Sequence, residues 1–224
     1  MVYLYLVPKW FVGFDIGMEL LFALVAILVS FFAFKVYKLS AQREIKLFGT
    51  SFLFIALAYV SLAFFNLSIL SHLRDKINYV ILERIEHLGL LGVYSHILFF
   101  LIGLVTLAYM TIRVKKFRIF LLLFGVALAV ILFSPYKLMA LHTVLSILLC
   151  FIVFYYLTEY YKNKSIKTGL ICIAFIFLLL GIIGLVFSSF SYNYYVAGHI
   201  LELVSYLIIL FNLVFVIKNE QKKK

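Results

Sequence analysis

His199 and Glu202 lie three positions apart inside a long apolar stretch close to the C-terminus. Imidazole and carboxylate groups transfer protons and bind metal ions in proteins. An ionisable side chain at the centre of a membrane-spanning helix costs about 3 kcal/mol on insertion scales, and such residues mark a function by default. These two residues are therefore the first candidates for a functional site.

Other polar residues occupy apolar stretches of the same chain. At a rise of about 1.5 Å per residue, the acidic, amide and histidine side chains in these stretches fall roughly 6–12 Å below one boundary of the membrane. Asp15, Glu19, Asn66 and Tyr206 are candidates for ligand binding, and His96, His142, His199 and Glu202 are candidates for binding a metal or haem.

Helical spacing places these polar groups on faces that pack against other helices. Tyr206 shares a face with His199 and Glu202, and Gly92 shares one with His96. Small residues in a membrane helix favour close contact with a neighbour. We therefore expect Glu19, His96, His142, His199 and Glu202 to form one site. In a closed ring the first and last helices are adjacent, so His199 and Glu19 are the most informative pair for testing whether these residues form one site. Glu19 begins a row whose other members are small residues: Ala23, Ala26, Ser30 and Ala33.

Four interpretations of this cluster remain open. Three histidines and two glutamates are suitable ligands for zinc or non-haem iron, and a zinc with one open position would activate water for hydrolysis. Two histidines from different helices could hold haem b. Tyrosine and phenylalanine side chains could form the walls of an organic-ligand or lipid pocket. The fourth interpretation is a hydrogen-bonded network that fixes the packing of the helices. No spacing in the sequence is a specific metal motif.

The elements that carry these residues are long apolar stretches, in a chain of 224 residues that is 67% hydrophobic. A helix needs about 20 apolar residues to cross a bilayer, with a range of about 17–25. The sequence predicts one all-α domain over residues 1–224, a seven-helix membrane bundle. A tight turn is expected at Pro135, close packing at Gly181 and Gly184, and a separate helix on the outer membrane surface over about 72–87. The predicted spans are 11–36, 47–70, 88–112, 117–133, 136–160, 166–187 and 195–217.

The distribution of basic residues predicts the orientation of this bundle. Of the 20 lysine and arginine residues, 15 lie at one set of helix ends and 5 at the other. The positive-inside rule then places the N-terminus outside and the C-terminus in the cytoplasm of a multi-pass protein of the cell membrane. The net charge of +11 is therefore a topology signal and does not predict nucleic-acid binding. The expected partners are the lipid bilayer and a cytoplasmic protein that docks on the basic loops.

Three segments carry a resemblance to known proteins: "FDIGMELLFALVAILVSFFAFKVYKLS", "LFGTSFLFIALAYV" and "VAGHILELVSYLIILFNLVFVIK". They resemble poorly characterised seven-helix membrane proteins of archaea and the seven-helix input modules of sensory proteins. The resemblance implies a role in sensing. Microbial rhodopsins have a lysine near the middle of the last helix, whereas here the lysine of that helix is Lys218 at its end. Seven-helix hydrolases of the ceramidase kind have an HxxxH motif in the last helix. Here the residue four positions after His199 is Leu203, so this chain does not have that motif.

The function expected from the sequence is the binding of a ligand, metal or haem in an outward-facing polar pocket, for sensing or electron transfer. One alternative is a metal-dependent intramembrane hydrolase that acts on a lipid. A further alternative is a structural membrane subunit with a buried polar network. The cofactors considered are zinc, iron and haem b. An odd number of helices and the lack of an evident internal repeat disfavour a transporter.

Overall fold

The computed structural model describes residues 13–73, 79–113 and 116–221, without the side chains of 72–73, 79–86 and 219–221. The described residues form seven α-helices, which confirms the predicted all-α class. They are α1 (Phe14–Ser40), α2 (Arg43–Leu73), α3 (Tyr79–Ile112), α4 (Phe117–Phe133), α5 (Lys137–Asn163), α6 (Ile166–Phe187) and α7 (Tyr192–Gln221).

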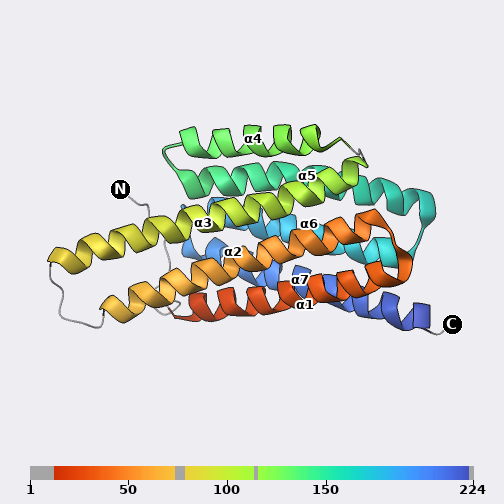
Figure 1. Cartoon of the computed structure of the whole chain (residues 1–224), viewed down its shortest axis with the longest axis horizontal. Coiled ribbons are helices and arrows are strands. Elements are labelled where there is room, and N and C mark those ends of the chain that lie inside the picture. Colours follow the sequence, from red (N-terminus) through yellow and green to blue (C-terminus); the bar gives the residue numbers. More distant parts are fainter. Residues whose placement is uncertain (1–12, 74–78, 114–115, 222–224) are drawn as a thin grey trace.

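Consecutive helices run in opposite directions along one bundle (Figure 1). The start of α1, the α4–α5 turn and the α6–α7 turn lie at one end, which we call the N-terminal face. The α1–α2 and α5–α6 turns, the end of α3 with the start of α4, and the end of α7 lie at the other, which we call the C-terminal face. The basic residues of these turns, such as Lys38, Lys116 and Lys164, are therefore gathered at the C-terminal face.

Most of the helices close into a ring around a common core. In the described part of the chain, α1, α2, α3, α5, α6 and α7 contact one another in that order, and α7 returns to α1. The helix α4 contacts only α3 and α5, so it lies outside the ring. This arrangement confirms that the first and last helices are adjacent.

The described helices are those of a polytopic membrane protein. Six of them are long and apolar enough to cross a bilayer, and α4 is a shorter apolar helix of 17 residues. Since α3 and α5 both run from the N-terminal face to the C-terminal face, α4 has to return the chain between those faces (Figure 1). Its length is about 25 Å at the usual helical rise, near the lower limit for a membrane span.

The connections differ from the sequence prediction at one place and agree at another. Residues 79–87 continue into α3 instead of belonging to a separate interfacial helix over 72–87, and residues 74–78 lie outside the described part. The predicted turn at Pro135 is present between α4 and α5. There the Lys137 ammonium donates to the carbonyls of Leu132 and Ser134, at 3.1 and 3.3 Å, and so caps the end of α4.

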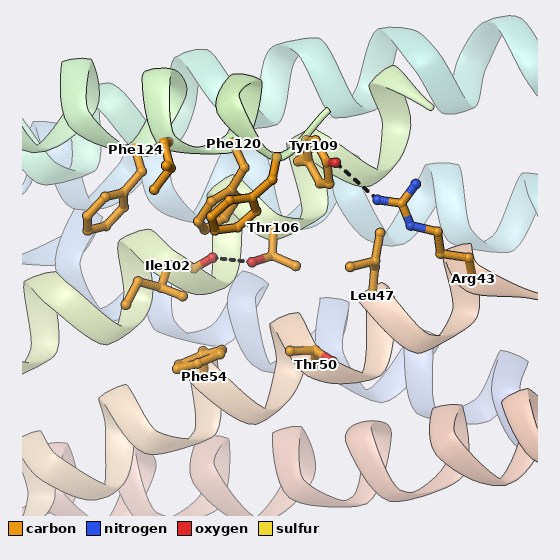
Figure 2. Close-up of a pocket in the computed structure, with 11 residues that line it drawn as sticks. Arg43, Leu47, Thr50, Phe54, Ile102, Thr106, Tyr109, Phe120 and Phe124 are labelled. Carbon is orange, nitrogen blue, oxygen red and sulfur yellow. Dashed lines mark hydrogen bonds between the residues drawn. The ribbon is translucent and has the colours of Figure 1, made fainter. Parts of the chain in front are cut away.

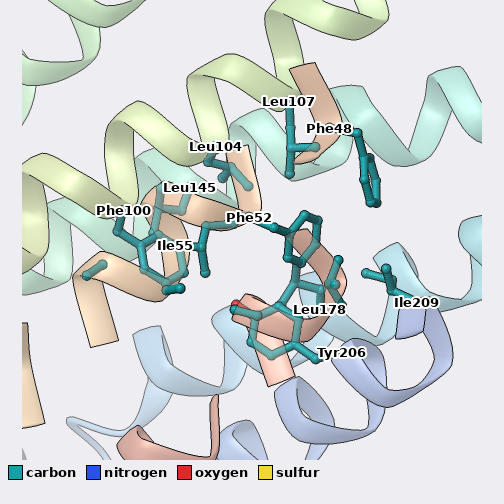
Figure 3. Packing of buried hydrophobic residues seen from close by; sticks show 14 of the residues in the cluster. Phe48, Phe52, Ile55, Phe100, Leu104, Leu107, Leu145, Leu178, Tyr206 and Ile209 are labelled. Atoms are coloured by element: carbon teal, nitrogen blue, oxygen red, sulfur yellow. The ribbon is translucent and has the colours of Figure 1, made fainter. Parts of the chain in front are cut away.

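Aromatic and aliphatic side chains fill the centre of the ring. Phe52 and Ile55 of α2, Leu145 of α5 and Tyr206 of α7 are fully or almost fully buried (Figure 3). The predicted row of small residues on α1 is buried, and Ser30 donates from Oγ to the Gly49 carbonyl at 2.8 Å. The small side chains therefore allow α1 and α2 to approach closely.

Glycines fix the close contact between α6 and α7. A Cβ atom added at Gly181 would lie 2.9 Å from the Gly198 carbonyl oxygen and 3.2 Å from the Glu202 amide nitrogen. A Cβ added at Gly198 would lie 2.9 Å from the Gly181 carbonyl oxygen. The two backbones can approach this closely only because neither position has a side chain. The predicted packing role of Gly181 and Gly184 is confirmed.

Candidate functional site: a buried polar network near the N-terminal face

Glu202 is the most enclosed acidic group of the site. Its residue is 1% exposed, on the face of α7 that is directed into the ring. The Tyr59 hydroxyl of α2 donates a short hydrogen bond to Oε1 of Glu202. The Tyr206 hydroxyl, one turn further along α7, donates to the same oxygen at 3.3 Å. Two phenols thus replace the water that this carboxylate would otherwise bind.

His199 lies between two carboxylates. Its Nε2 atom is 3.7 Å from Oδ1 of Asp15 on α1, and its Nδ1 atom is 3.7 Å from Oε2 of Glu202. The side chain of Asp15 is 20% exposed, that of His199 is 11% exposed and that of Glu202 is 2% exposed. The three groups therefore form a row that leads from the N-terminal end of α1 into the closed interior.

Aromatic rings hold this row in place. The Tyr195 hydroxyl donates to Oδ1 of Asp15 at 2.7 Å, and the Tyr195 ring meets the His199 ring edge-on at 4.5 Å. The Phe22 ring of α1 lies beside both His199 and Tyr59. Its centroid is 5.7 Å from that of the His199 ring and 5.0 Å from that of the Tyr59 ring. Because Gly198 is packed against Gly181, α7 has a fixed position from which His199 faces α1.

Glu19 has its hydrogen-bond partner on α2. Its Oε1 atom accepts a hydrogen bond of 2.8 Å from Nδ2 of Asn66 on α2. Glu19 is 4% exposed, and its Oε2 atom has no hydrogen-bond partner in the described part of the chain. Glu19 thus pairs with Asn66, and Asp15 is the residue of α1 that lies beside His199.

The two remaining histidines are buried on neighbouring helices. His96 of α3 has Nδ1 at 3.2 Å from the Ala58 carbonyl oxygen, and its ring meets the Tyr59 ring edge-on at 5.8 Å. His142 of α5 is 9% exposed. Its backbone carbonyl accepts a hydrogen bond from Ser146. His96 therefore borders the network through Tyr59.

The described residues do not support the predicted metal site. Nowhere among them do three or more histidine, cysteine, aspartate or glutamate side chains come together in a way that could hold a metal ion. The rings of Phe22, Tyr59 and Tyr206 fill the space beside His199 and Glu202. The residues His96, His142, His199 and Glu202 thus line the interior without forming a metal, haem or ligand site that the described structure defines.

Three residues of the network were not among the predicted site residues: Phe22, Tyr59 and Tyr195. Tyr59 lies seven positions before Asn66 and Tyr195 lies four positions before His199, so each shares a helical face with a predicted residue. This helical spacing is the feature of the sequence from which Tyr59 and Tyr195 could have been predicted as site residues. Phe22 has no polar group that would have identified it.

The position of His199 has a direct consequence for protonation. A neutral imidazole has one N–H donor and one acceptor nitrogen. With carboxylate oxygens 3.7 Å from both nitrogens, a neutral imidazole faces one of these oxygens with a lone pair, whereas a doubly protonated imidazole faces each of them with an N–H group.

Comparisons with known proteins give no assignment for this chain: no protein-family model, no curated protein and no solved structure matches it.

Proposed function

We propose that this chain is a proton-responsive membrane protein whose sensing site is the row of Asp15, His199 and Glu202. The observation that carries the proposal is the 3.7 Å approach of each ring nitrogen of His199 to a carboxylate oxygen. A proton bound in this row allows a charge-assisted contact between α1 and α7 on one side and within α7 on the other. Without that proton, a lone pair faces a carboxylate, and the contact is repulsive.

The gradient of exposure supports proton entry from the N-terminal face. Asp15 is the most accessible group, and Glu202 with its two tyrosines is the innermost. Other polar groups of the bundle lie on the ring helices: Glu19 on α1, Asn66 on α2, His96 on α3 and His142 on α5. The helix α7 then extends from the network to the basic C-terminal face. A cytoplasmic partner bound at that face would respond to a change in the position of α7. The resemblance to sensory input modules is consistent with this role.

Infrared difference spectroscopy between acid and alkaline pH tests the proposal on the full chain in lipid nanodiscs. We expect a carboxyl C=O band that changes with pH in the wild type and shifts or disappears in Glu202→Gln or Asp15→Asn. The His199→Gln variant should alter the pH midpoint of the same band. The matched control is Glu44→Gln, an exposed acid in the first turn of α2, which should leave the band unchanged. Identical spectra in the wild type and the three network variants would disprove the proposal.

A structural membrane subunit is the second candidate. The observation in its favour is that Tyr59 with Glu202, and Asn66 with Glu19, join α2 to α7 and to α1. Under this candidate the network variants lower the thermal stability equally at all pH values, and no carboxyl band responds to pH. The lipid-hydrolase alternative has no comparable support, because the described residues bring together no set of three metal ligands.

A further inference from the structure

A groove lies on the outside of the ring and extends from the middle of the bundle to the C-terminal face. Its floor is α3 and its two walls are α2 and α4, which do not contact each other in the described part of the chain. The groove has a volume of about 470 Å³, which is within the usual range of ligand pockets. Figure 2 shows its lining residues: Arg43, Leu47, Thr50, Phe54, Ile102, Thr106, Tyr109, Phe117, Phe120, Leu121 and Phe124.

The floor and walls of this groove are apolar in effect. The two threonine hydroxyls donate to carbonyls of their own helices, Thr106 to Ile102 at 2.7 Å and Thr50 to Lys46 at 2.9 Å. The wall formed by α4 is a row of phenylalanine rings, in which Phe120 and Phe124 are parallel to within 4°. Such a surface fits a hydrocarbon chain and has no free polar group to bind a polar ligand along its length.

One end of the groove is charged. The Arg43 guanidinium donates from Nη2 to the Tyr109 hydroxyl at 3.0 Å and lies 5.6 Å from the centre of that ring. A guanidinium has five N–H donors in a fork that matches phosphate oxygens. No carboxylate lies within ion-pair distance of Arg43 among the described residues. Tyr109 thus holds the guanidinium at the mouth of the groove with most of its donors directed elsewhere (Figure 2).

The length of the groove matches one leaflet of a bilayer. Arg43 and Phe54 are eleven positions apart on α2, which corresponds to about 16 Å along the helix. Half of a hydrocarbon core of about 30 Å is close to this length. Arg43 is at the C-terminal face, where Lys46, Lys116 and Arg118 add further positive charge. Basic pockets between membrane helices are typical sites for anionic lipid head groups.

We propose that this groove binds one anionic phospholipid, with an acyl chain along α3 between α2 and α4 and the phosphate on Arg43. A partner helix would bury the apolar walls as well, but it would leave the guanidinium without an anion. The phospholipid satisfies both parts of the groove at once. This proposal is independent of the proton-responsive site.

Native mass spectrometry of the full chain in detergent, with added phosphatidylglycerol or phosphatidylcholine, tests the inference. We expect one phosphatidylglycerol to be retained and phosphatidylcholine to bind more weakly. Because hydrogen bonds to charged groups are the strong ones, Arg43→Gln should weaken phosphatidylglycerol binding about tenfold. The matched control Arg118→Gln removes the same charge outside the groove and should have little effect. Leu47→Trp fills the groove, keeps Arg43 and should also weaken binding.

Three outcomes would overturn the proposal. Equal weakening by Arg43→Gln and Arg118→Gln would mean attraction to the overall charge and no specific site. Equal binding of the two lipids, lost only in Leu47→Trp, would mean an apolar contact without recognition of the head group. A dimer in which the groove is covered by a second copy, detected as the main species without lipid, would assign the groove to an interface. Circular dichroism of each variant confirms that it is folded before the lipid titration is interpreted.

Discussion

The Tyr59 hydroxyl is the main hydrogen-bond donor to the buried Glu202 carboxyl group, and the two residues are 143 positions apart in the chain. Burial of a carboxylate is tolerated only when donors replace its water shell. Tyr206 contributes a second and longer hydrogen bond of 3.3 Å. The position of Glu202 in the ring is thus set by one residue of another helix and one of its own.

The first prediction concerns these two tyrosines. Tyr59→Phe should lower the stability in detergent by about 1–3 kcal/mol, because it leaves a buried acceptor without its best donor. Tyr206→Phe should lower it less. The matched control is Tyr94→Phe on α3, which is 40% exposed and should change little. Thermal unfolding followed by circular dichroism ranks the three variants. An equal loss of stability in Tyr59→Phe and Tyr94→Phe would show that the hydrogen bond from Tyr59 to Glu202 does not stabilise the protein.

The second prediction separates the two possible partners of His199. Asp15→Asn and His199→Gln should be non-additive, with a coupling energy of about 0.5–3 kcal/mol, because the two side chains face each other directly. Glu19→Gln and His199→Gln should couple more weakly, since Glu19 is bonded to Asn66. The measurement is a pair of double-mutant cycles on thermal stability. Stronger coupling of His199 to Glu19 than to Asp15 would contradict the pairing in the structure.

The sequence predicted which polar residues lie inside the bundle, but only part of how they pair. Glu19, His96, His142, His199 and Glu202 are all buried, because the periodicity of each helix identifies its packed face. Pairing depends on the rotation and height of helices far apart in the chain, which no local pattern contains. For this reason Asp15 instead of Glu19 faces His199, and Tyr59 was not recognised as the donor to Glu202.

The contact between α6 and α7 determines where the network lies. Gly181 and Gly198 bring the two backbones together one turn away from Glu202, so the orientation of α7 in the ring depends on a contact without side chains. Packing of small residues is the main source of close helix association in membranes. The spacing of Gly181 and Gly184 made this contact predictable from the sequence. The placement of α4 outside the ring was not predicted, because an apolar membrane helix can pack in the core or face lipid on several sides.

The third prediction tests this contact. Gly198→Ala should lower thermal stability and weaken the coupling between Asp15 and His199, because the added Cβ meets the Gly181 carbonyl oxygen and α7 has to move. The matched control is Gly125→Ala on α4, where a Cβ meets nothing within 4 Å. That control should be neutral or stabilising by about 0.5–1 kcal/mol, as expected for alanine in place of glycine in a helix. Equal effects of both changes would show that the α6–α7 backbone contact is unimportant.

The two groups of polar residues in the molecule lie at opposite ends of the bundle. The buried acids and histidines lie towards the N-terminal face, and the basic turns and the groove with Arg43 lie towards the C-terminal face. This separation fits a bundle whose basic end faces the cytoplasm, by the positive-inside rule. Whether the separation corresponds to the two sides of a membrane depends on α4, because an odd number of crossings places the two ends of the chain on opposite sides.

The fourth prediction tests the crossings of α4 and α5 with single cysteines in a background of Cys150→Ala and Cys172→Ala. Lys116→Cys precedes α4, Tyr136→Cys lies between α4 and α5, and Asn163→Cys ends α5; all three positions are exposed. A membrane-impermeant maleimide on intact cells should label only Tyr136→Cys, and the other two should react after permeabilisation. The reverse pattern would place the polar network on the cytoplasmic side. Equal labelling of Lys116→Cys and Tyr136→Cys would mean that α4, with its 17 residues, does not cross the membrane. The parallel directions of α3 and α5 argue against that result, because the chain can return to the N-terminal face only through α4.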